Sequence, residues 1–153
     1  YRKEQLILSK HINTFVSNLL NYSLGGIKME PYSTNIEKET IENENYRKVL
    51  YTGKMQLVVM SLKPGEDIPE EVHDNIDQFF RIEQGEAYIK VDDEEFNLND
   101  DDIIIIPAGS KHYVKNSSEN KVLKVYTIYT PPEHSPETIH KTKEDADNAE
   151  HNH

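Results

Sequence analysis

The sequence predicts an all-β fold, a sandwich or a barrel built from short strands. Segments rich in β-branched and aromatic residues follow one another from residue 47 to residue 130. Glycine, proline and aspartate separate these segments at short intervals, and no helical pattern interrupts the series. A chain of 153 residues is long enough to bury a real core but too short for two substantial domains. We therefore expect one domain with extensions.

Nine segments account for the expected strands. In order they are Arg47 to Thr52, Met55 to Leu62, a strand carrying Glu71 and His73, Asp77 to Gln84, Ala87 to Val91, Glu95 to Leu98, Ile103 to Ile106, Tyr113 to Lys115 and Val122 to Thr130. Because Ile103 to Ile106 is a continuous apolar run, we expect that strand to be buried on both faces.

The ends of the chain lack this pattern. Residues 4–22 have the apolar spacing of an amphipathic helix, so residues 1–28 are expected to form a helical extension that packs on the domain or on a partner. The domain proper should span residues 29–132, beginning with a polar arm or linker. Residues 133–153 form a polar tail. Within it, Thr142 to His151 fits a short solvated helix, while disorder or packing on a neighbouring subunit fits equally well.

The composition excludes several classes of function. Seventeen basic and 28 acidic residues give a formal charge of -11, which disfavours binding to nucleic acid or to anionic membrane surfaces. No apolar run approaches the roughly 20 residues of a membrane span, and no signal peptide is recognisable. The absence of cysteine rules out thiolate ligands, so a metal would need nitrogen and oxygen donors. We expect a cytoplasmic protein that takes a small-molecule ligand.

Four residues form a candidate metal site. Side chains two apart in a strand share a face, so Glu71 and His73 can point to the same interior. Gln78 opens the next strand, and His112 follows a turn at residues 107–110. Two imidazoles, one carboxylate and one amide oxygen suit Mn(II), Fe(II), Ni(II) or Zn(II). The histidines of the polar tail are expected to be solvated; they are His134, His140, His151 and His153, and His11 is placed on the helix surface.

The spacing of these residues resembles two motifs of the cupins. The first motif runs Gly, five residues, His, one residue, His, three or four residues, Glu, six residues, Gly, and it coincides with Gly65, Glu71, His73, Gln78 and Gly85. The second runs Gly, five residues, Pro, one residue, Gly, two residues, His, three residues, Asn, and it coincides with Asp101, Pro107, Gly109, His112 and Asn116. The resemblance covers residues 45–130 and implies a jelly-roll β-barrel that forms a homodimer.

Three positions depart from the motifs. Glu71 stands in place of the first His, Gln78 in place of the Glu, and Asp101 in place of the opening Gly of the second motif. Because the first two changes move the single carboxylate from one position to another, the site keeps one formal negative charge. The chain also resembles small single-domain cupins labelled mannose-6-phosphate isomerase-like, a label that reflects similarity of fold.

Two functions follow as hypotheses. The first is a metal-dependent enzyme on a small organic substrate, of the isomerase, decarboxylase or dioxygenase type, with the ion as Lewis acid. The second is a non-catalytic cupin that binds a small molecule or serves as a structural or interaction module. The residues beyond the metal site reveal no catalytic machinery that would choose between reactions.

Overall fold

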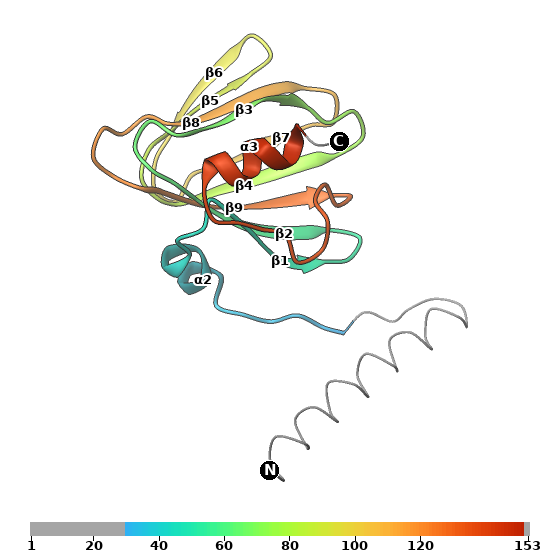
Figure 1. Ribbon diagram of the computed structural model, residues 1–153. Coiled ribbons are helices and arrows are strands. Elements are labelled where there is room, and N and C mark those ends of the chain that lie inside the picture. Colours follow the sequence, from blue (N-terminus) through green and yellow to red (C-terminus); the bar gives the residue numbers. More distant parts are fainter. Residues whose placement is uncertain (1–29, 152–153) are drawn as a thin grey trace. The chain divides into compact units, whose positions relative to one another are not determined.

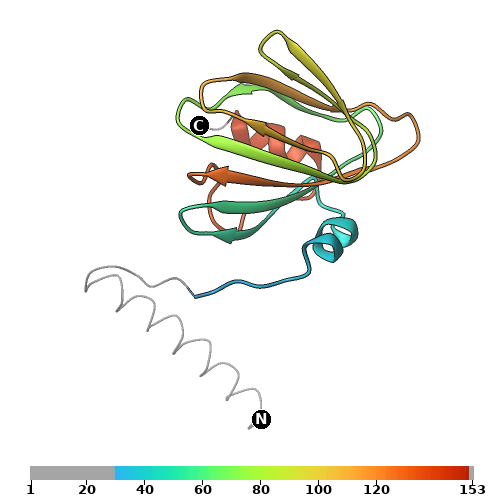
Figure 2. The ribbon, with the colours of Figure 1, turned by 180° about the vertical axis from the view of Figure 1, so that it is seen from behind.

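The strands of the computed structural model, which describes residues 30–151, form two antiparallel sheets that lie face to face (Figures 1 and 2). The six-stranded sheet has the order β10-β1-β2-β9-β4-β7, and the four-stranded sheet has the order β3-β8-β5-β6. The strands are β1 (Arg47–Thr52), β2 (Gln56–Leu62), β3 (Asp67–Val72), β4 (Asp77–Gln84), β5 (Ala87–Val91), β6 (Glu94–Leu98), β7 (Ile103–Ile106), β8 (Lys111–Asn116), β9 (Leu123–Thr130) and β10 (Ile139–His140). This architecture confirms the all-β prediction.

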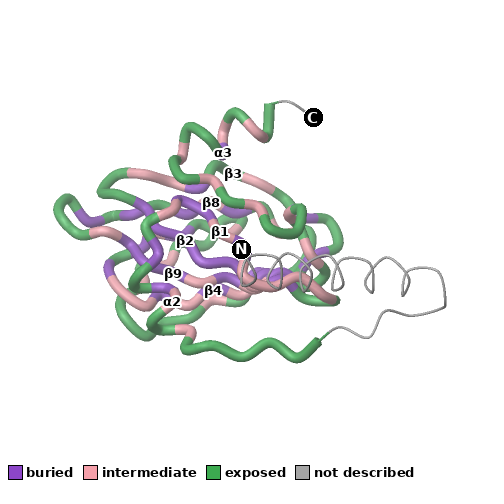
Figure 3. The backbone as a smooth tube through the Cα atoms, turned by 60° about the horizontal axis from the view of Figure 1, so that its bottom comes forward, coloured by how far each residue is buried: buried purple, intermediate pink, exposed green. Residues whose placement is uncertain are grey.

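The core lies between the two sheets. Alternate residues of each strand point inward, so the buried stretches of the chain gather in the strands while most connecting loops are exposed (Figure 3). The largest fully buried apolar side chains are Met60, Leu62, Phe80, Ile82, Ile89, Ile106 and Leu123. Phe80 and Ile82 share the inner face with Gln78, as the alternation predicts, but they fill the core instead of lining an open pocket.

The prediction that Ile103 to Ile106 is buried on both faces is wrong. Strand β7 lies at the edge of the six-stranded sheet, beside β4 alone. Its outward residues Ile103 and Ile105 are 50% and 61% exposed, whereas Ile106 on the inner face is 1% exposed. A continuous apolar run does not distinguish a central strand from an edge strand with one covered face.

A helix occupies part of the segment that the sequence analysis describes as a polar arm or linker. Helix α2 spans Ile36–Glu42, and the side chain of its N-cap residue Asn35 accepts a hydrogen bond of 3.0 Å from the backbone N–H of Lys38. It contacts β2, β4 and β9, and Thr40 is its buried residue. The Asn35 cap followed by Glu37 and Glu39 is a helix-start signal that could have predicted it.

The C-terminal residues fold onto the sheets. Strand β10 pairs with β1, and helix α3 (Lys143–Glu150) begins with a capping box between Thr142 and Asp145. Ala146 of α3 belongs to the core, and Lys143 lies 3.3 Å from Asp67 of β3. The helix therefore lies across the side of the sandwich, between β3 of one sheet and β1 with β10 of the other (Figure 1). A short solvated helix is one of the alternatives for this segment; the helix is present, but it packs on the sheets through Ala146 and is not fully solvated.

Two sequence predictions concern the ends of the chain. The helical extension at residues 1–28, with His11, and the terminal His153 lie outside the described residues. The boundaries at residues 28 and 132 remain predictions, although Ser33 onward forms one compact unit. Neither α2 nor α3, the helices of the described chain, has the length and apolar character needed to cross a membrane.

The two faces of β7 should respond differently to truncation. Ile106→Ala removes a fully buried side chain and should lower the free energy of unfolding by about 2–5 kcal/mol. Ile105→Ala removes the same atoms from the exposed face and should cost less than about 1 kcal/mol. Urea unfolding of both variants measures the difference, and equal losses would contradict the edge position of β7.

Candidate metal centre

Two turns hold the candidate site at one end of the sandwich. One joins β3 to β4 and carries His73; the other, at residues 107–110, precedes β8. The backbone N–H of Gly109 donates to the carbonyl of His73 at 2.7 Å, and the N–H of Ala108 donates to a carboxylate oxygen of Asp77 at 2.8 Å. Gly109 has a φ of 84°, which a residue with a side chain rarely adopts, so glycine lets the second turn close against the first.

The pairing of β3 with β8 brings Glu71 opposite His112. Ile68 pairs with Val114 and Glu71 pairs with His112, so β3 contains one residue more than β8 over this interval. This bulge shifts the alternation, so that both Ile68 and Glu71 point inward although three positions separate them. Glu71 would face outward without it.

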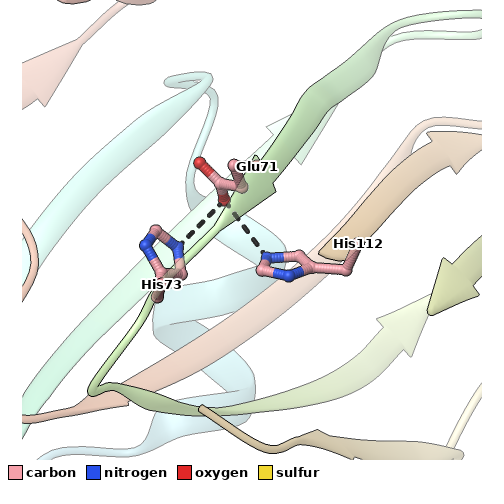
Figure 4. A group of neighbouring side chains, drawn as sticks. All are labelled: Glu71, His73 and His112. Carbon is pink, nitrogen blue, oxygen red and sulfur yellow. Dashed lines mark ion pairs between the residues drawn. The ribbon is translucent and has the colours of Figure 1, made fainter. Parts of the chain in front are cut away.

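The three side chains meet at a single carboxylate oxygen. Glu71 Oε1 lies 3.3 Å from His73 Nε2 and 3.4 Å from His112 Nε2, as the dashed lines in Figure 4 mark. One donor atom from each residue lies within 4.8 Å of the others. His112 is 2% exposed and His73 is 9% exposed. The structure thus brings together three of the four residues that the sequence analysis proposes as ligands.

In each imidazole an oxygen atom lies near Nδ1, whereas Nε2 has no hydrogen-bond partner among the described residues. His112 Nδ1 lies 3.0 Å from the carbonyl of Ser110, and His73 Nδ1 lies 3.5 Å from Glu133 Oε2. Within the described residues, both Nε2 atoms are buried without a hydrogen-bond partner, and Glu71 Oε1 lies 3.3 Å from one and 3.4 Å from the other. Acceptors at Nδ1 favour the tautomer that carries its proton there. Nε2 of each ring is then free to bind a cation.

The electrostatics of the cluster favour a charged carboxylate. Burial alone would raise the pKa of Glu71, yet the adjacent His112 and His73 lower this pKa to about 2. In turn, contact with Glu71 raises the pKa of His73, against the effect of burial. Glu71 is therefore ionised across the physiological range, and its negative charge favours a cation at the point where the three side chains meet.

Gln78, the fourth proposed ligand, has a mixed environment. It is 1% exposed at the start of β4, and its Nε2 donates a hydrogen bond of 3.0 Å to Thr127 Oγ1. Its Oε1 is buried and has no hydrogen-bond partner among the described residues. No described contact joins Gln78 to the other three residues, so its role as a ligand stays a prediction.

The three-residue cluster fits a divalent ion. Ligand atoms bound at about 2.1 Å to a tetrahedral ion lie about 3.4 Å apart. The two Glu71 contacts, at 3.3 and 3.4 Å, have this separation. The buried, unpartnered Nε2 atoms supply the neutral donors that such an ion needs.

Tyr129 of β9 and residues that follow this strand lie beside the cluster, and their place there is not predicted from the sequence. The ring of Tyr129 lies edge-on to the ring of His73, with 6.0 Å between centroids, and Tyr129 Oη lies 3.2 Å from His134 Nε2. His134 and His140 are half-buried, so the expectation that they are solvated is wrong for both. Gln56 holds the backbone of His134 through hydrogen bonds of 2.7 and 2.9 Å. A polar stretch carries no apolar period, so this tertiary contact left no signal in the sequence.

Asp101 explains one departure from the second motif. It stands where the motif has glycine, and its φ is 72°. Aspartate tolerates this left-handed conformation better than most residues with a side chain. The Asp101 carboxylate also accepts a hydrogen bond of 2.9 Å from Arg81, so the turn keeps its shape without the glycine.

A two-sheet β-barrel with a Glu-His-His cluster at one end defines the class of protein. The family model described as "Cupin domain" matches residues 58–129. The chain is 45% identical over 128 residues to the uncharacterised protein YrkC of Bacillus subtilis (strain 168), covering 79% of this chain and 68% of YrkC. It is 46% identical over 112 residues to the uncharacterised protein L612 of Acanthamoeba polyphaga mimivirus, covering 71% of this chain and 70% of L612.

A solved structure agrees with these relatives. The crystal structure of BH2720 from Bacillus halodurans matches with a TM-score of 0.75 and 40% identity, over 78% of this chain and 95% of that chain. The chain belongs to the cupin family, and its two sheets are the cupin jelly roll.

The pairing of Glu71 with His73 predicts a change in titration. In chelator-treated protein, Glu71→Gln removes the carboxylate that raises the pKa of His73, so this pKa should fall in an NMR titration of the histidine ring protons. Glu70→Gln is a matched control, because Glu70 is exposed and lies 3.7 Å from Lys111 instead. An unchanged His73 titration in Glu71→Gln would contradict the arrangement.

The same pair gives stability a pH dependence. A raised pKa in the folded state means that the stabilisation is fully present below the unfolded value of about 6.5 and is lost as pH rises through the folded value. The free energy of unfolding of metal-free wild-type protein should therefore decrease above about pH 6.5, and that of Glu71→Gln should decrease less. Urea unfolding across this pH range measures the difference.

Proposed function

We propose that this cupin binds a divalent metal ion through Glu71, His73 and His112 and acts as a metal-dependent enzyme on a small organic substrate. The observation that carries the proposal is the pair of buried Nε2 atoms, which face one carboxylate oxygen and have no hydrogen-bond partner in the described chain. Leaving such atoms unsatisfied costs free energy, and a bound ion would recover it. Mn(II), Fe(II), Ni(II) and Zn(II) all accept this set of donors.

The residues around the cluster have defined tasks in this proposal. Glu71 supplies the negative charge, and Glu133 and the Ser110 carbonyl orient the two rings through Nδ1. Burial raises the pKa of Tyr129, so its phenol stays protonated beside the site. A bound ion would polarise a substrate oxygen as a Lewis acid. Isomerisation, decarboxylation and dioxygenation are each compatible with this chemistry.

The alternative is a non-catalytic cupin, in which the same barrel binds a small molecule or serves as an interaction module. The two hypotheses differ in whether a bound substrate is converted. Homodimer formation, a cytoplasmic location and the mannose-6-phosphate isomerase-like subtype remain predictions. The motif residues determine the barrel and its ligand positions, and they leave the reaction open.

Removing one imidazole should abolish metal binding. His112→Ala should weaken the affinity for a divalent ion by more than about 100-fold, because a ligand matters more than the outer groups that orient it. Elemental analysis of the purified protein, followed by titration with zinc or manganese, measures this. His151→Ala is the matched control, since His151 is exposed. Equal metal content in wild type and His112→Ala would contradict the proposed site.

Removing the carboxylate of Glu133, which orients His73, should weaken metal binding less than removing the imidazole of His112. Glu133→Gln removes the negative charge beside His73 Nδ1 and should weaken metal binding by about 10- to 100-fold. Glu119→Gln changes an exposed glutamate in the same way and should leave the affinity unchanged. If both variants bind the ion equally well, Glu133 does not orient His73.

A further inference from the structure

A polar cavity lies beside the candidate metal centre. Its volume is about 280 Å³. Its wall includes Arg47, Glu133, His134, His140, Ala149 and Glu150. Glu133 belongs to both sites, because it also lies 3.5 Å from His73 Nδ1. A ligand in this cavity would thus contact a residue that touches the metal centre.

Arg47 is the unusual member of this wall. It opens β1, its side chain lies on the inner face of the sheet like that of Val49, and the residue is only 2% exposed. One guanidinium nitrogen lies 3.2 Å from His140 Nδ1, and the guanidinium carbon lies 5.5 Å from the Tyr46 ring centroid. Nε is buried without a hydrogen-bond partner in the described residues. At least the Nε donor of this buried cation is therefore left for a ligand.

Among the described residues, no carboxylate forms an ion pair with Arg47, although Glu133 and Glu150 line the same cavity and the charge of Arg47 acts on Glu133. Burial and the nearby Arg47 charge lower the pKa of His134 to about 3 and hold that of His140 below its ordinary value, so both rings are neutral at pH 7. Buried charges in proteins are normally paired, so this one calls for an anion.

The other charges on the wall limit which anion fits. A guanidinium binds a carboxylate or a phosphate through two parallel hydrogen bonds. Glu133 and Glu150 would repel a dianion such as phosphate, but each can accept a hydrogen bond from a hydroxyl or an ammonium group. The cavity is also smaller than most ligand pockets, which favours a compact molecule.

We propose that this cavity binds a small carboxylic acid with a hydroxyl or amino group on the adjacent carbon. The carboxylate contacts Arg47, and the hydroxyl or amino group donates to Glu133, on the side of His73. The ligand would lie near Glu133, on the Nδ1 side of His73, whereas the proposed metal position is at Nε2. The inference therefore goes beyond the proposed function, and it assigns to Arg47 a role in ligand binding and not in metal binding.

Calorimetry with four simple probes tests the chemistry. Zinc-loaded protein is titrated with glycolate, glycine, acetate and inorganic phosphate. Glycolate or glycine should bind more tightly than acetate, which lacks the second donor, and more tightly than phosphate. Comparing glycolate with glycine distinguishes a hydroxyl from an amino group. Phosphate or acetate as the tightest ligand, or no binding by any probe, would overturn the proposal.

Substitutions test the residues. Arg47→Gln should weaken glycolate or glycine binding by about 30-fold or more, as expected for the loss of one partner of a buried charge pair. Arg81→Gln is the matched control, because Arg81 pairs with Asp101 away from the cavity. Since Arg47 is buried and its loss can impair folding, Ala149→Leu provides a second variant that fills the cavity from α3. Glu144→Leu places the same side chain at an exposed position of α3.

Metal content separates this inference from the proposed function. Loss of probe binding in Arg47→Gln and Ala149→Leu, with the zinc content of wild type, supports the inference. Zinc-loaded variants that bind the probe as wild type does would overturn it and leave the metal site intact. A wild-type protein that takes up no divalent ion but binds the probe through Arg47 would contradict the proposed function and support the cavity.

Discussion

The antiparallel pairing of β3 with β8 sets the positions of Glu71 and His112 in the candidate metal centre. It places Glu71 directly opposite His112, and the one-residue bulge after Ile68 turns Glu71 inward. Pro69 lies in this bulge. Proline has no backbone N–H to donate to a neighbouring strand, and it is tolerated here because β3 is an edge strand. A register slip of one residue would send Glu71 to the solvent face and leave two buried imidazoles without their carboxylate.

The C-terminal segment completes the site that this pairing begins. The backbone of His134 is held by Gln56 of β2, which places Glu133 beside His73. Beyond it, β10 pairs with β1, and α3 crosses to β3 through the Lys143–Asp67 ion pair. A segment with almost no apolar residues therefore depends on capping, strand pairing and ion pairs for its position. It adds Glu133 to one side of the candidate metal centre and forms most of the wall of the charged cavity beside it.

The sequence predicted the parts of this protein that depend on local periodicity and on motif spacing. Strand alternation placed Glu71, His73 and Gln78, and the turn at Gly109 placed His112. The position of β7 at a sheet edge was not predictable, because a continuous apolar run such as Ile103 to Ile106 is compatible with a central strand and with an edge strand. Glu133, His134 and Arg47 were missed for a different reason. Their place in the site comes from contacts between residues far apart in the chain, and neither a motif nor a period records those contacts. The helix α2 did carry a signal, the Asn35 cap, and could have been predicted.

Anomalous diffraction from a metal-soaked crystal tests the central claim most directly. Data collected at the absorption edge of zinc or manganese locate the ion without reference to activity. We predict one strong peak about 2.0–2.2 Å from Glu71 Oε1, His73 Nε2 and His112 Nε2. A peak on the acidic surface alone, with both Nε2 atoms still bare, would contradict the assignment of these residues to a metal centre.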